Sequence, residues 1–542
     1  MRAQSWRATF AVGIVLILAV SACGRSAGTT NTGQTLGLAN TTPAGSKAVD
    51  SIVWGVYRET NSLDPIYAFD YPENTVLAVL CEQLLTQAPD GAIGPGLATL
   101  TYPDPTTLVF DLKPGVTFWD GNPMTADDVA YSLNRNTDAN LGGFYGQVFT
   151  NVTSITATSP TQVTIKLSKP DYWLPDELAS TPGWIVEKAY VESKGKDFGT
   201  PTGGTMCTGA YKFQSWQPGN GVVVVRNDNY WNKSKVKLLV RQITFKGTPD
   251  EASLTSALQT GDVNGYYAFA LSTLDQLRAS KKVTVTDGSG WNVDAFIVSN
   301  FKGALGDKRV RQAFSMSIDR KGMIDAIFKG AAGMPKALTP PGTWGFSRST
   351  FQAGYDALPD LKQDIPSAKK LIQDAGMTGK SITIGMSSEL TDVSLEASAY
   401  QAAGQAIGID VKLKSVSAAN YINFFIDPNA RADIDGFFTT NYGDYADPAG
   451  LLATLVLPDG SQNYSGYDNP QVDGYMNAAR SEANLDKRAQ DMVLAQKVSM
   501  DDLPWIPDAF PNNELITSSS LTGAVASFAY MFAPWANSLG GK

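Results

Sequence analysis

The chain has 542 residues, enough for several domains or for one large body with more than one lobe. Its 43 basic and 52 acidic residues give a formal net charge of -9. This balance disfavours nucleic acid and anionic membrane surfaces as partners, because both are bound by clustered Lys and Arg. The chain contains no histidine, so it lacks the commonest metal ligand and the commonest general base. We expect no metal and no other cofactor.

The N-terminal 22 residues have the pattern of a secretory signal peptide. Arg2 and Arg7 precede an apolar run, FAVGIVLILAV, at residues 10–20, and small residues follow it. The run is too short for a typical helix that spans a bilayer. We therefore expect the protein to be exported.

Cys23 ends the tetrad VSAC, which resembles a bacterial lipobox, whose cysteine is lipidated and becomes the mature N-terminus. The alternative is an ordinary signal peptide that happens to precede a cysteine. Residues 23–49, rich in Gly, Thr, Ser, Asn and Ala, lack apolar periodicity and predict a flexible tether. Acyl chains on Cys23 would hold the protein in the lipid bilayer, at the outer face of the cytoplasmic membrane.

Two further cysteines, Cys81 and Cys207, follow in the body of the chain. In an oxidising, exported setting an even pair predicts a disulfide bond. The alternative is a pair of buried free thiols.

The first third of the body combines strands with an inserted helix. Residues 106–118 alternate between apolar and polar, with a Pro-Gly turn at 114–115, and residues 162–167 alternate in the same way. Between them Thr125 and Asp128 form a capping box ahead of a helical pattern. This order is typical of an α+β region.

Later segments alternate between strands and helices. GVVVVRND and VRQITFKG predict strands, residues 252–258 predict a helix, and Asp307 and Asp319 each precede a helical pattern as N-caps. From about Ser367 the segments SAKKLIQDAG, SITIGM, ASAYQAAGQAIG and IDVKLKSV indicate α/β packing in a second large lobe. The fold class that we predict is mixed α/β.

Several of these segments resemble a known family, the extracytoplasmic solute-binding proteins of oligopeptide and dipeptide ABC importers. The strongest segment is FDLKPGVTFWDGNPMTADDVAYSLNR at residues 110–135. Supporting segments, in the family order, are NSLDP from residue 61, CEQLLTQAPDGAIGPGLA from 81, TGAYKFQSWQPG from 208, NYW from 229, KRVRQAFSMSIDR from 308 and GYDNPQVD from 466.

The resemblance implies two lobes that close on a ligand like a clam, with an extra domain inserted in the first lobe. On this basis we assign residues 50–82 to lobe I, 83–201 to the inserted domain, 202–298 to lobe I, 299–513 to lobe II and 514–542 to lobe I. It also implies a monomeric protein without enzymatic activity, which closes on a short peptide and delivers it to ABC permease subunits in the membrane.

The segment GDYADP at residues 443–448 matches the place where peptide-binding members of the family hold the α-ammonium group of the peptide. The resemblance puts Asp444 in that role, with Tyr442 and Tyr445 as rings that exclude water and add cation–π contact. Asp447 precedes Pro448 and is expected to be structural. The alternative is a solvated turn before the proline.

Three more residues are candidates for the pocket. Trp344 and Trp291 would suit peptide side chains and also sugar rings, with ordinary core packing as the alternative for each. Arg58 lies near a strand that the family uses in its cleft, so it is a candidate partner for the ligand carboxylate.

The sequence leaves the ligand open. A sugar, an opine or a metal chelate is the alternative to a peptide in the same binding role. An exported hydrolase is the alternative from another class, because Asp444 and Asp447 could be read as an acid and a base. GMTGKS at residues 376–381 does not have the spacing of a phosphate-binding loop.

Overall fold

The computed structural model describes residues 37–268 and 271–542. The predicted signal peptide at 1–22, Cys23 and residues 24–36 of the predicted tether lie outside the described residues. The rest of that tether contacts the body: the Ala39 amide donates to the Asp287 carbonyl at 2.9 Å, and the Lys47 amide donates to the Gly541 carbonyl at 3.0 Å. The compact unit runs from Leu38 to Lys542, so it begins before the predicted boundary at residue 50.

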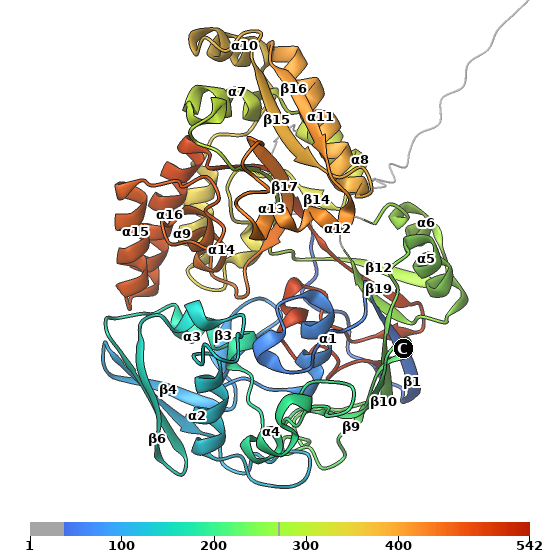
Figure 1. Ribbon diagram of the computed structural model, residues 1–542. Helices are drawn as coiled ribbons and strands as arrows, with labels where there is room; N and C mark the ends of the chain where they lie inside the picture. Colours follow the sequence, from blue (N-terminus) through green and yellow to red (C-terminus); the bar gives the residue numbers. More distant parts are fainter. Residues whose placement is uncertain (1–36, 269–270) are drawn as a thin grey trace, which may run out of the picture. The chain divides into compact units, whose positions relative to one another are not determined.

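The first lobe is built on a seven-stranded sheet (Figure 1). Strand β1 pairs in parallel with β10 on one side and with β11 on the other. In spatial order the strands are β12 (Val283–Gly288), β19 (Asn513–Ser518), β11 (Gly265–Ala268), β1 (Val49–Val56), β10 (Val240–Gly247), β9 (Gly221–Arg226) and β8 (Tyr211–Gln217).

The second lobe is built on a six-stranded sheet, in which β15 and β16 pair in parallel and α11 packs along them (Figure 1). In spatial order the strands are β14 (Ala332–Gly333), β18 (Trp505–Pro511), β13 (Asn292–Val298), β17 (Gly436–Tyr442), β15 (Ser381–Met386) and β16 (Asp410–Ser415). The mixed α/β class and the two lobes agree with the sequence prediction.

The chain crosses between the two sheets at 289–291, between β12 and β13, and at Asn512, between β18 and β19. The first crossing precedes the predicted boundary at 298/299, because β13 pairs with β17 and β18 and so belongs to the second lobe. The sequence of residues 292–298 does not show which sheet they join, because every residue of β13 is buried.

The inserted region has a four-stranded antiparallel sheet of its own, in the order β4 (Ala98–Asp104), β5 (Thr107–Leu112), β7 (Gln162–Leu167) and β6 (Val152–Ser159). Its apolar core runs from Leu84 to Ile185, whereas Val191 and Phe198 pack into the core of the first lobe. This core therefore ends before the predicted boundary at 201. The pair β2 (Leu85–Gln87) and β3 (Ile93–Pro95) lies at its start, and β20 (Leu521–Thr522) pairs with β21 (Gly540–Gly541) near the C-terminus.

A disulfide joins Cys81 to Cys207, as the sequence predicts, with the two Cα atoms 4.9 Å apart. Cys81 directly follows helix α1 of the first lobe, and Cys207 precedes β8 of the same lobe. The bond therefore links the points at which the chain leaves the first lobe and returns to it.

The helices fall into the same three groups. The first lobe has α1 (Tyr71–Leu80), α5 (Glu251–Thr260) and α6 (Leu274–Ala279); the inserted region and its return have α2 (Ala126–Arg135), α3 (Leu174–Glu177) and α4 (Lys188–Lys194). The second lobe has α7 (Lys308–Ser317), α8 (Arg320–Ile327), α9 (Arg348–Asp356), α10 (Ile365–Asp374), α11 (Thr391–Ile407), α12 (Ala418–Tyr421), α13 (Asn423–Ile426), α14 (Ala449–Val456), α15 (Pro470–Ser481) and α16 (Leu485–Asp502). Short 3-10 helices are η1 (Pro65–Tyr67), η2 (Gly146–Phe149), η3 (Thr181–Gly183), η4 (Gly195–Asp197), η5 (Ala304–Gly306), η6 (Pro341–Thr343) and η7 (Phe528–Met531).

The helix starts follow from capping side chains. Thr125 and Asp128 form both halves of the predicted capping box of α2. Asp307 and Asp319 cap α7 and α8, as predicted, each by accepting a hydrogen bond from a backbone amide in the first turn. Among the described residues, no helix is both long enough and apolar enough to cross a membrane.

Candidate ligand-binding site

A cleft with a volume of ≈ 620 Å³ lies where the parallel strands of the first lobe end. The carboxyl ends of β1, β10 and β11 meet there, because β1 pairs in parallel with both of its neighbours. In open α/β sheets ligands bind outside the carboxyl ends of the strands, and ligand pockets are commonly ~300–1,000 Å³. The position and size of the cleft are therefore those of a small-molecule or peptide site.

Both lobes line the cleft. The first lobe contributes the ends of β1 and β11 and the start of α5, and the second lobe contributes the end of α8 and the start of α11. Asn292, Asn512 and Asn513, at or next to the two crossings between the sheets, also line it. A ligand in the cleft would thus touch both lobes.

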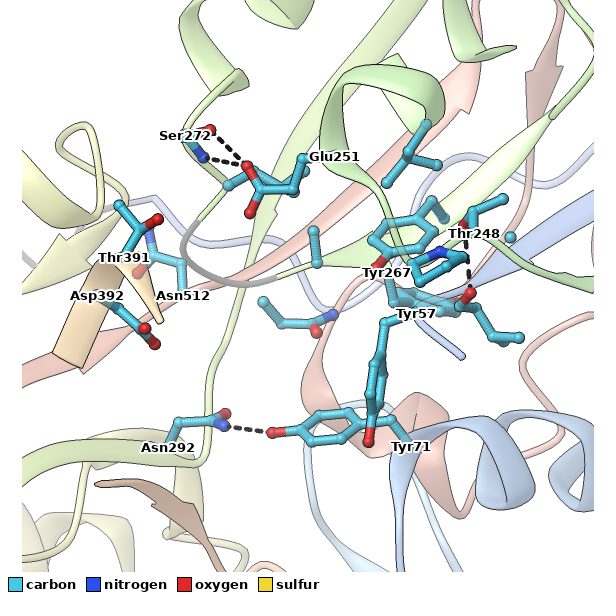
Figure 2. A pocket seen from close by; sticks show the side chains of 18 of the residues that line it. Tyr57, Tyr71, Thr248, Glu251, Tyr267, Ser272, Asn292, Thr391, Asp392 and Asn512 are labelled. Carbon is cyan, nitrogen blue, oxygen red and sulfur yellow. Dashed lines mark hydrogen bonds between the residues drawn. The ribbon is translucent and has the colours of Figure 1, made fainter. Parts of the chain in front are cut away.

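The wall of the cleft is rich in tyrosine (Figure 2). The rings of Tyr267 and Tyr530 stack with their centroids 3.5 Å apart, and the ring of Tyr71 meets that of Phe528 edge-on. The Asn292 side-chain amide donates to the Tyr71 hydroxyl at 3.0 Å, so this contact joins the second lobe to the first. Such rings offer large apolar faces together with polar hydroxyl groups.

Carboxylates outnumber cations among the described residues that line the cleft. Glu251 comes from the first lobe, Glu389 and Asp392 come from the second, and the cation is Lys329. The Lys329 ammonium donates to the Ala326 carbonyl at 2.8 Å. Burial raises the pKa of Asp392, and the charge of Glu251 raises it further.

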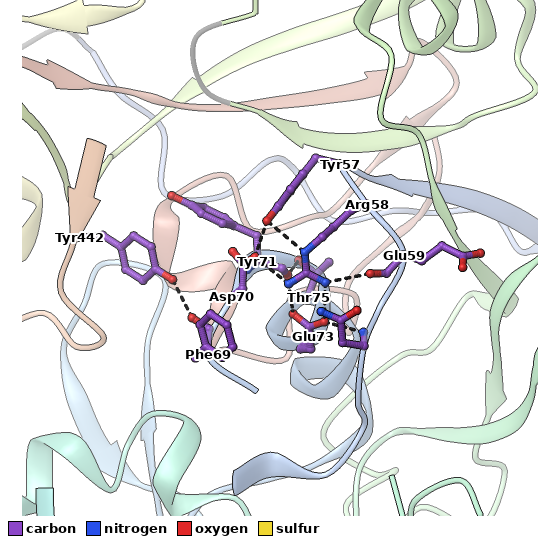
Figure 3. A network of polar contacts seen from close by, with 10 residues as sticks. Tyr57, Arg58, Glu59, Phe69, Asp70, Tyr71, Glu73, Thr75 and Tyr442 are labelled. Carbon is purple, nitrogen blue, oxygen red and sulfur yellow. Dashed lines mark hydrogen bonds and ion pairs between the residues drawn. The ribbon is translucent and has the colours of Figure 1, made fainter. Parts of the chain in front are cut away.

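Arg58, a predicted partner of a ligand carboxylate, is fully engaged within the protein (Figure 3). Its Nε donates to the Tyr57 hydroxyl, and its four Nη hydrogens are directed to the carboxylates of Asp70 and Glu73 and to the Glu59 carbonyl. A guanidinium has five N–H donors, so none is left for a ligand. In this conformation Arg58 orients Tyr57, which lines the cleft, and secures the start of α1.

The turn at residues 443–448 docks on the inserted region. The Gln87 side chain donates to the Asp444 carbonyl at 3.0 Å and accepts from the Ala446 amide at 3.1 Å. The Asp444 carboxylate is partly buried, accepts no hydrogen bond from a described residue, and has a pKa that burial raises to about 7. The charge of Asp444 in turn raises the pKa of Glu177, on α3, after the larger effect of burial.

The two tyrosines of this segment differ in their surroundings. The Tyr442 hydroxyl donates to the Phe69 carbonyl at 3.1 Å, and its ring packs on Tyr71 and Phe528 of the cleft wall. Tyr445 is buried, and its hydroxyl lies near Glu177, where it opposes part of the rise in pKa that burial causes. Tyr442 therefore connects the turn to the cleft.

Asp447 has the structural role that its place before Pro448 suggests. Its Oδ1 accepts from the Ala449 amide at 2.8 Å, and its Oδ2 lies 3.3 Å from Nη2 of Arg488. The same nitrogen pairs with Asp176 of the inserted region at 2.9 Å. We call Arg488, Asp176 and Asp447 the Arg488 cluster. It joins the second lobe to the inserted region through buried charges.

Trp291 and Trp344 do not line the cleft. Trp291 is 1% exposed and packs against Phe528 and Phe532, and Trp344 is 6% exposed and packs against Phe351 and Tyr355. The alternative reading of ordinary core packing describes both in this structure.

Sequence reasoning missed Glu251, Glu389, Asp392 and Lys329. One sequence signal pointed to Glu251. It begins the helix that follows the strand predicted from VRQITFKG, and ligands bind at the carboxyl ends of strands in parallel sheets. The other three come from the second lobe, and no local pattern places them opposite Glu251. Within the part of the chain that the structure describes, no group of His, Cys, Asp and Glu side chains is arranged to hold a metal ion.

Comparison with known proteins places this architecture among binding proteins. The model of the bacterial extracellular solute-binding proteins, family 5, matches residues 92–463. The periplasmic murein peptide-binding protein MppA of Escherichia coli (strain K12) is 27% identical over 470 residues, covering 83% of this chain and 85% of the relative. The probable D,D-dipeptide-binding periplasmic protein DdpA of the same organism is 26% identical over 505 residues, covering 90% and 94%.

A solved structure agrees in fold over most of the chain. The ABC transporter-associated periplasmic binding protein DppA from Helicobacter pylori, in complex with the peptide STSA, matches with a TM-score of 0.76. The match covers 91% of this chain and 98% of that one at 21% identity, so it supports the fold alone.

Proposed function

The chain belongs to the bacterial extracellular solute-binding proteins of family 5, and from this premise we propose that it captures short peptides for an ABC importer. The family and the relatives above are solute-binding proteins and not enzymes, so the exported hydrolase is set aside. Relatives named for murein peptides and dipeptides support a peptide as the ligand.

The observation that carries this proposal is the Asp444 carboxylate. Burial raises its pKa to about 7, and no described residue donates a hydrogen bond to it. A peptide α-ammonium group would supply the opposite charge and the donors that this carboxylate lacks, in a charge-assisted hydrogen bond. Asp444 itself is not among the residues that line the cleft, whereas Tyr442, two residues earlier, packs on Tyr71 and Phe528 of the cleft wall.

Lys329 is our candidate for the other end of the peptide. Its ammonium makes one hydrogen bond, to Ala326, and has three hydrogens, whereas all five donors of Arg58 are used. We assign the ligand carboxylate to Lys329 in place of Arg58.

The two connections between the sheets would allow the lobes to close on the ligand. The chain crosses at 289–291 and at Asn512, so two short segments can act as a hinge. A ligand that touches both lobes favours the closed state, because the open state loses the contacts of one side. The cross-lobe contact from Asn292 to Tyr71 lies beside the first of these crossings and is present in this structure.

Delivery needs the exported, anchored state that the N-terminus predicts. In this proposal the signal peptide is removed before Cys23, acyl chains on Cys23 enter the bilayer, and the monomeric body reaches the permease from the outer face of the cytoplasmic membrane. The tether then comprises residues 23–37, because the compact unit begins at Leu38.

Calorimetric titration of the body from Leu38 onward with short peptides tests the proposal. We expect saturable binding of peptides that have a free amino group, with no turnover. Oligosaccharides, opines and metal chelates form the comparison set. If one of these three comparison classes binds and no peptide does, the assignment of a peptide ligand is wrong. The role in solute capture would still hold.

A further inference from the structure

The charged groups of the cleft come from both lobes and are mostly negative. Glu251 opens α5 on the first lobe, and Asp392 lies in the first turn of α11 on the second (Figure 2). Glu389 lies just before α11. Lys329 is the basic residue among the described lining residues. The formal charge of these four side chains is therefore negative.

The hydrogen bonds to the carboxylates of Glu251, Glu389 and Asp392 come from uncharged donors. One oxygen of Glu251 accepts from the amide and the hydroxyl of Ser272, and one oxygen of Glu389 accepts from the Ala418 amide. Backbone amides at the start of α11 stabilise the ionised form of Asp392. Within the described part of the chain, none of the three carboxylates forms an ion pair, although ion pairs with Lys or Arg are frequent elsewhere on this protein.

Closure as proposed above would bring these like charges closer together. Burial raises the pKa of Asp392 on the second lobe, and the charge of Glu251 on the first lobe raises it further, so the two carboxylates repel each other. A cation between them would turn this repulsion into attraction in the closed state, and a neutral group would leave it in place. Such a difference selects ligands by charge.

We propose that the ligand carries a positively charged side chain, and that Glu251 and Asp392 hold this side chain between the lobes. This inference rests on the proposed function, since it names the class of peptide that the cleft prefers: peptides with a basic residue. Tyr57, Tyr266 and Tyr267 also line the cleft and would offer apolar surface to the stem of a basic side chain.

Matched peptides test the inference on the unmodified protein. Short alanine peptides with a free amino group carry, at each position in turn, lysine, norleucine or glutamate. We expect the best lysine peptide to bind roughly tenfold to a hundredfold more tightly than its norleucine counterpart, as a desolvated charge pair provides. The glutamate peptide should bind most weakly, and added salt should reduce the lysine advantage.

Two variants then locate the selectivity. Glu251→Gln and Asp392→Asn should each remove most of the lysine advantage while the norleucine peptide keeps its affinity. Asp325→Asn is the matched control, because Asp325 is an exposed carboxylate on α8 that pairs with Lys321 and does not line the cleft. Equal melting temperatures of the three variants and the unmodified protein would show that folding is unaffected. If one variant does not fold, the comparison of lysine and norleucine peptides on the unmodified protein still tests the inference.

The possible outcomes separate this inference from the function on which it rests. Equal binding of lysine and norleucine peptides would overturn the inference and leave peptide capture intact. A lysine advantage that persists in both cleft variants would overturn the assignment to Glu251 and Asp392. If no peptide of the set binds, the proposed function fails, and the inference fails with it.

Discussion

Binding of a free amino group at Asp444 should depend on pH in a window where ordinary aspartates do not titrate. Burial raises the pKa of this carboxyl to about 7. An ammonium group binds the ionised form, so below that pKa the site must release a proton before it binds. We therefore expect affinity to fall as pH falls from 7 to 5, where the ligand amine itself stays charged.

The size of this effect follows from the pKa. The ionised fraction of Asp444 is about one half at pH 7 and about one hundredth at pH 5, so affinity should fall about fifty-fold, or about 2.3 kcal/mol. A carboxyl with the ordinary pKa of 3.8 would change affinity by less than about a tenth over the same range.

Isothermal titration calorimetry at several pH values measures this directly, with one peptide in its free and N-acetylated forms. The acetylated peptide lacks the cation, so its affinity should be lower and nearly constant. Asp444→Asn should lower the affinity for the free peptide at pH 7 by roughly tenfold to a hundredfold and flatten its pH profile. Glu177→Gln is the control, since it removes a neighbouring carboxyl with a raised pKa and should keep the pH dependence.

Two results would refute the reasoning. If the affinity of the Asp444→Asn variant depends on pH as that of the unmodified protein does, a group other than Asp444 causes the pH dependence. If the free and acetylated peptides lose equal affinity in the variant, Asp444 shapes the turn and does not meet the charge.

Four further predictions concern the anchor, the carboxylate end of the ligand and the stability of the body. Arg488→Met leaves two buried carboxylates without their cation and should lower the free energy of unfolding in urea by about 3–5 kcal/mol, whereas Arg241→Met, at an exposed ion pair, should change it little. Cys81→Ser opens a loop with a sequence separation of 126 and should cost about 4–5 kcal/mol in the same assay; an unchanged denaturation midpoint would contradict this. Lys329→Gln should lower the affinity for peptides with a free C-terminal carboxylate and leave the affinity for C-terminally amidated peptides unchanged. Equal losses of affinity for the two would show that Lys329 does not bind the carboxylate. Cys23→Ser should move the protein out of the membrane fraction or leave its signal uncleaved, and unchanged fractionation and mass would exclude the lipobox.

Local patterns predicted the elements of this fold well because caps and alternation act within a few residues. The capping box of Thr125 and Asp128 and the caps Asp307 and Asp319 lie where the sequence places them. The sheet to which a fully buried strand belongs is a long-range property. The pairing of β13 with β17 and β18 is of this kind, and nothing within residues 292–298 indicates it.

The site was harder to predict for the same reason. Arg58 looks like a free cation in sequence, yet Asp70 and Glu73 at the start of α1 accept hydrogen bonds from it once the chain is folded. Glu251 and Asp392 face one cleft from elements far apart in the chain. Asp447 was recognisable as structural because its cue, the following proline, is adjacent in sequence.

The disulfide has a consequence for how the inserted region relates to the rest of the protein. The Cα atoms of Cys81 and Cys207 lie 4.9 Å apart, little more than the ~3.8 Å between consecutive residues. The intervening segment leaves and rejoins the first lobe at nearly one point, and it carries a sheet and an apolar core of its own. A short turn could replace it without rethreading any strand of the seven-stranded sheet. A replacement would have to restore two buried ion pairs of the inserted region, from Arg135 to Asp64 of the first lobe and from Asp176 to Arg488 of the second. It would also have to restore the packing of Val191 and Phe198 in the core of the first lobe.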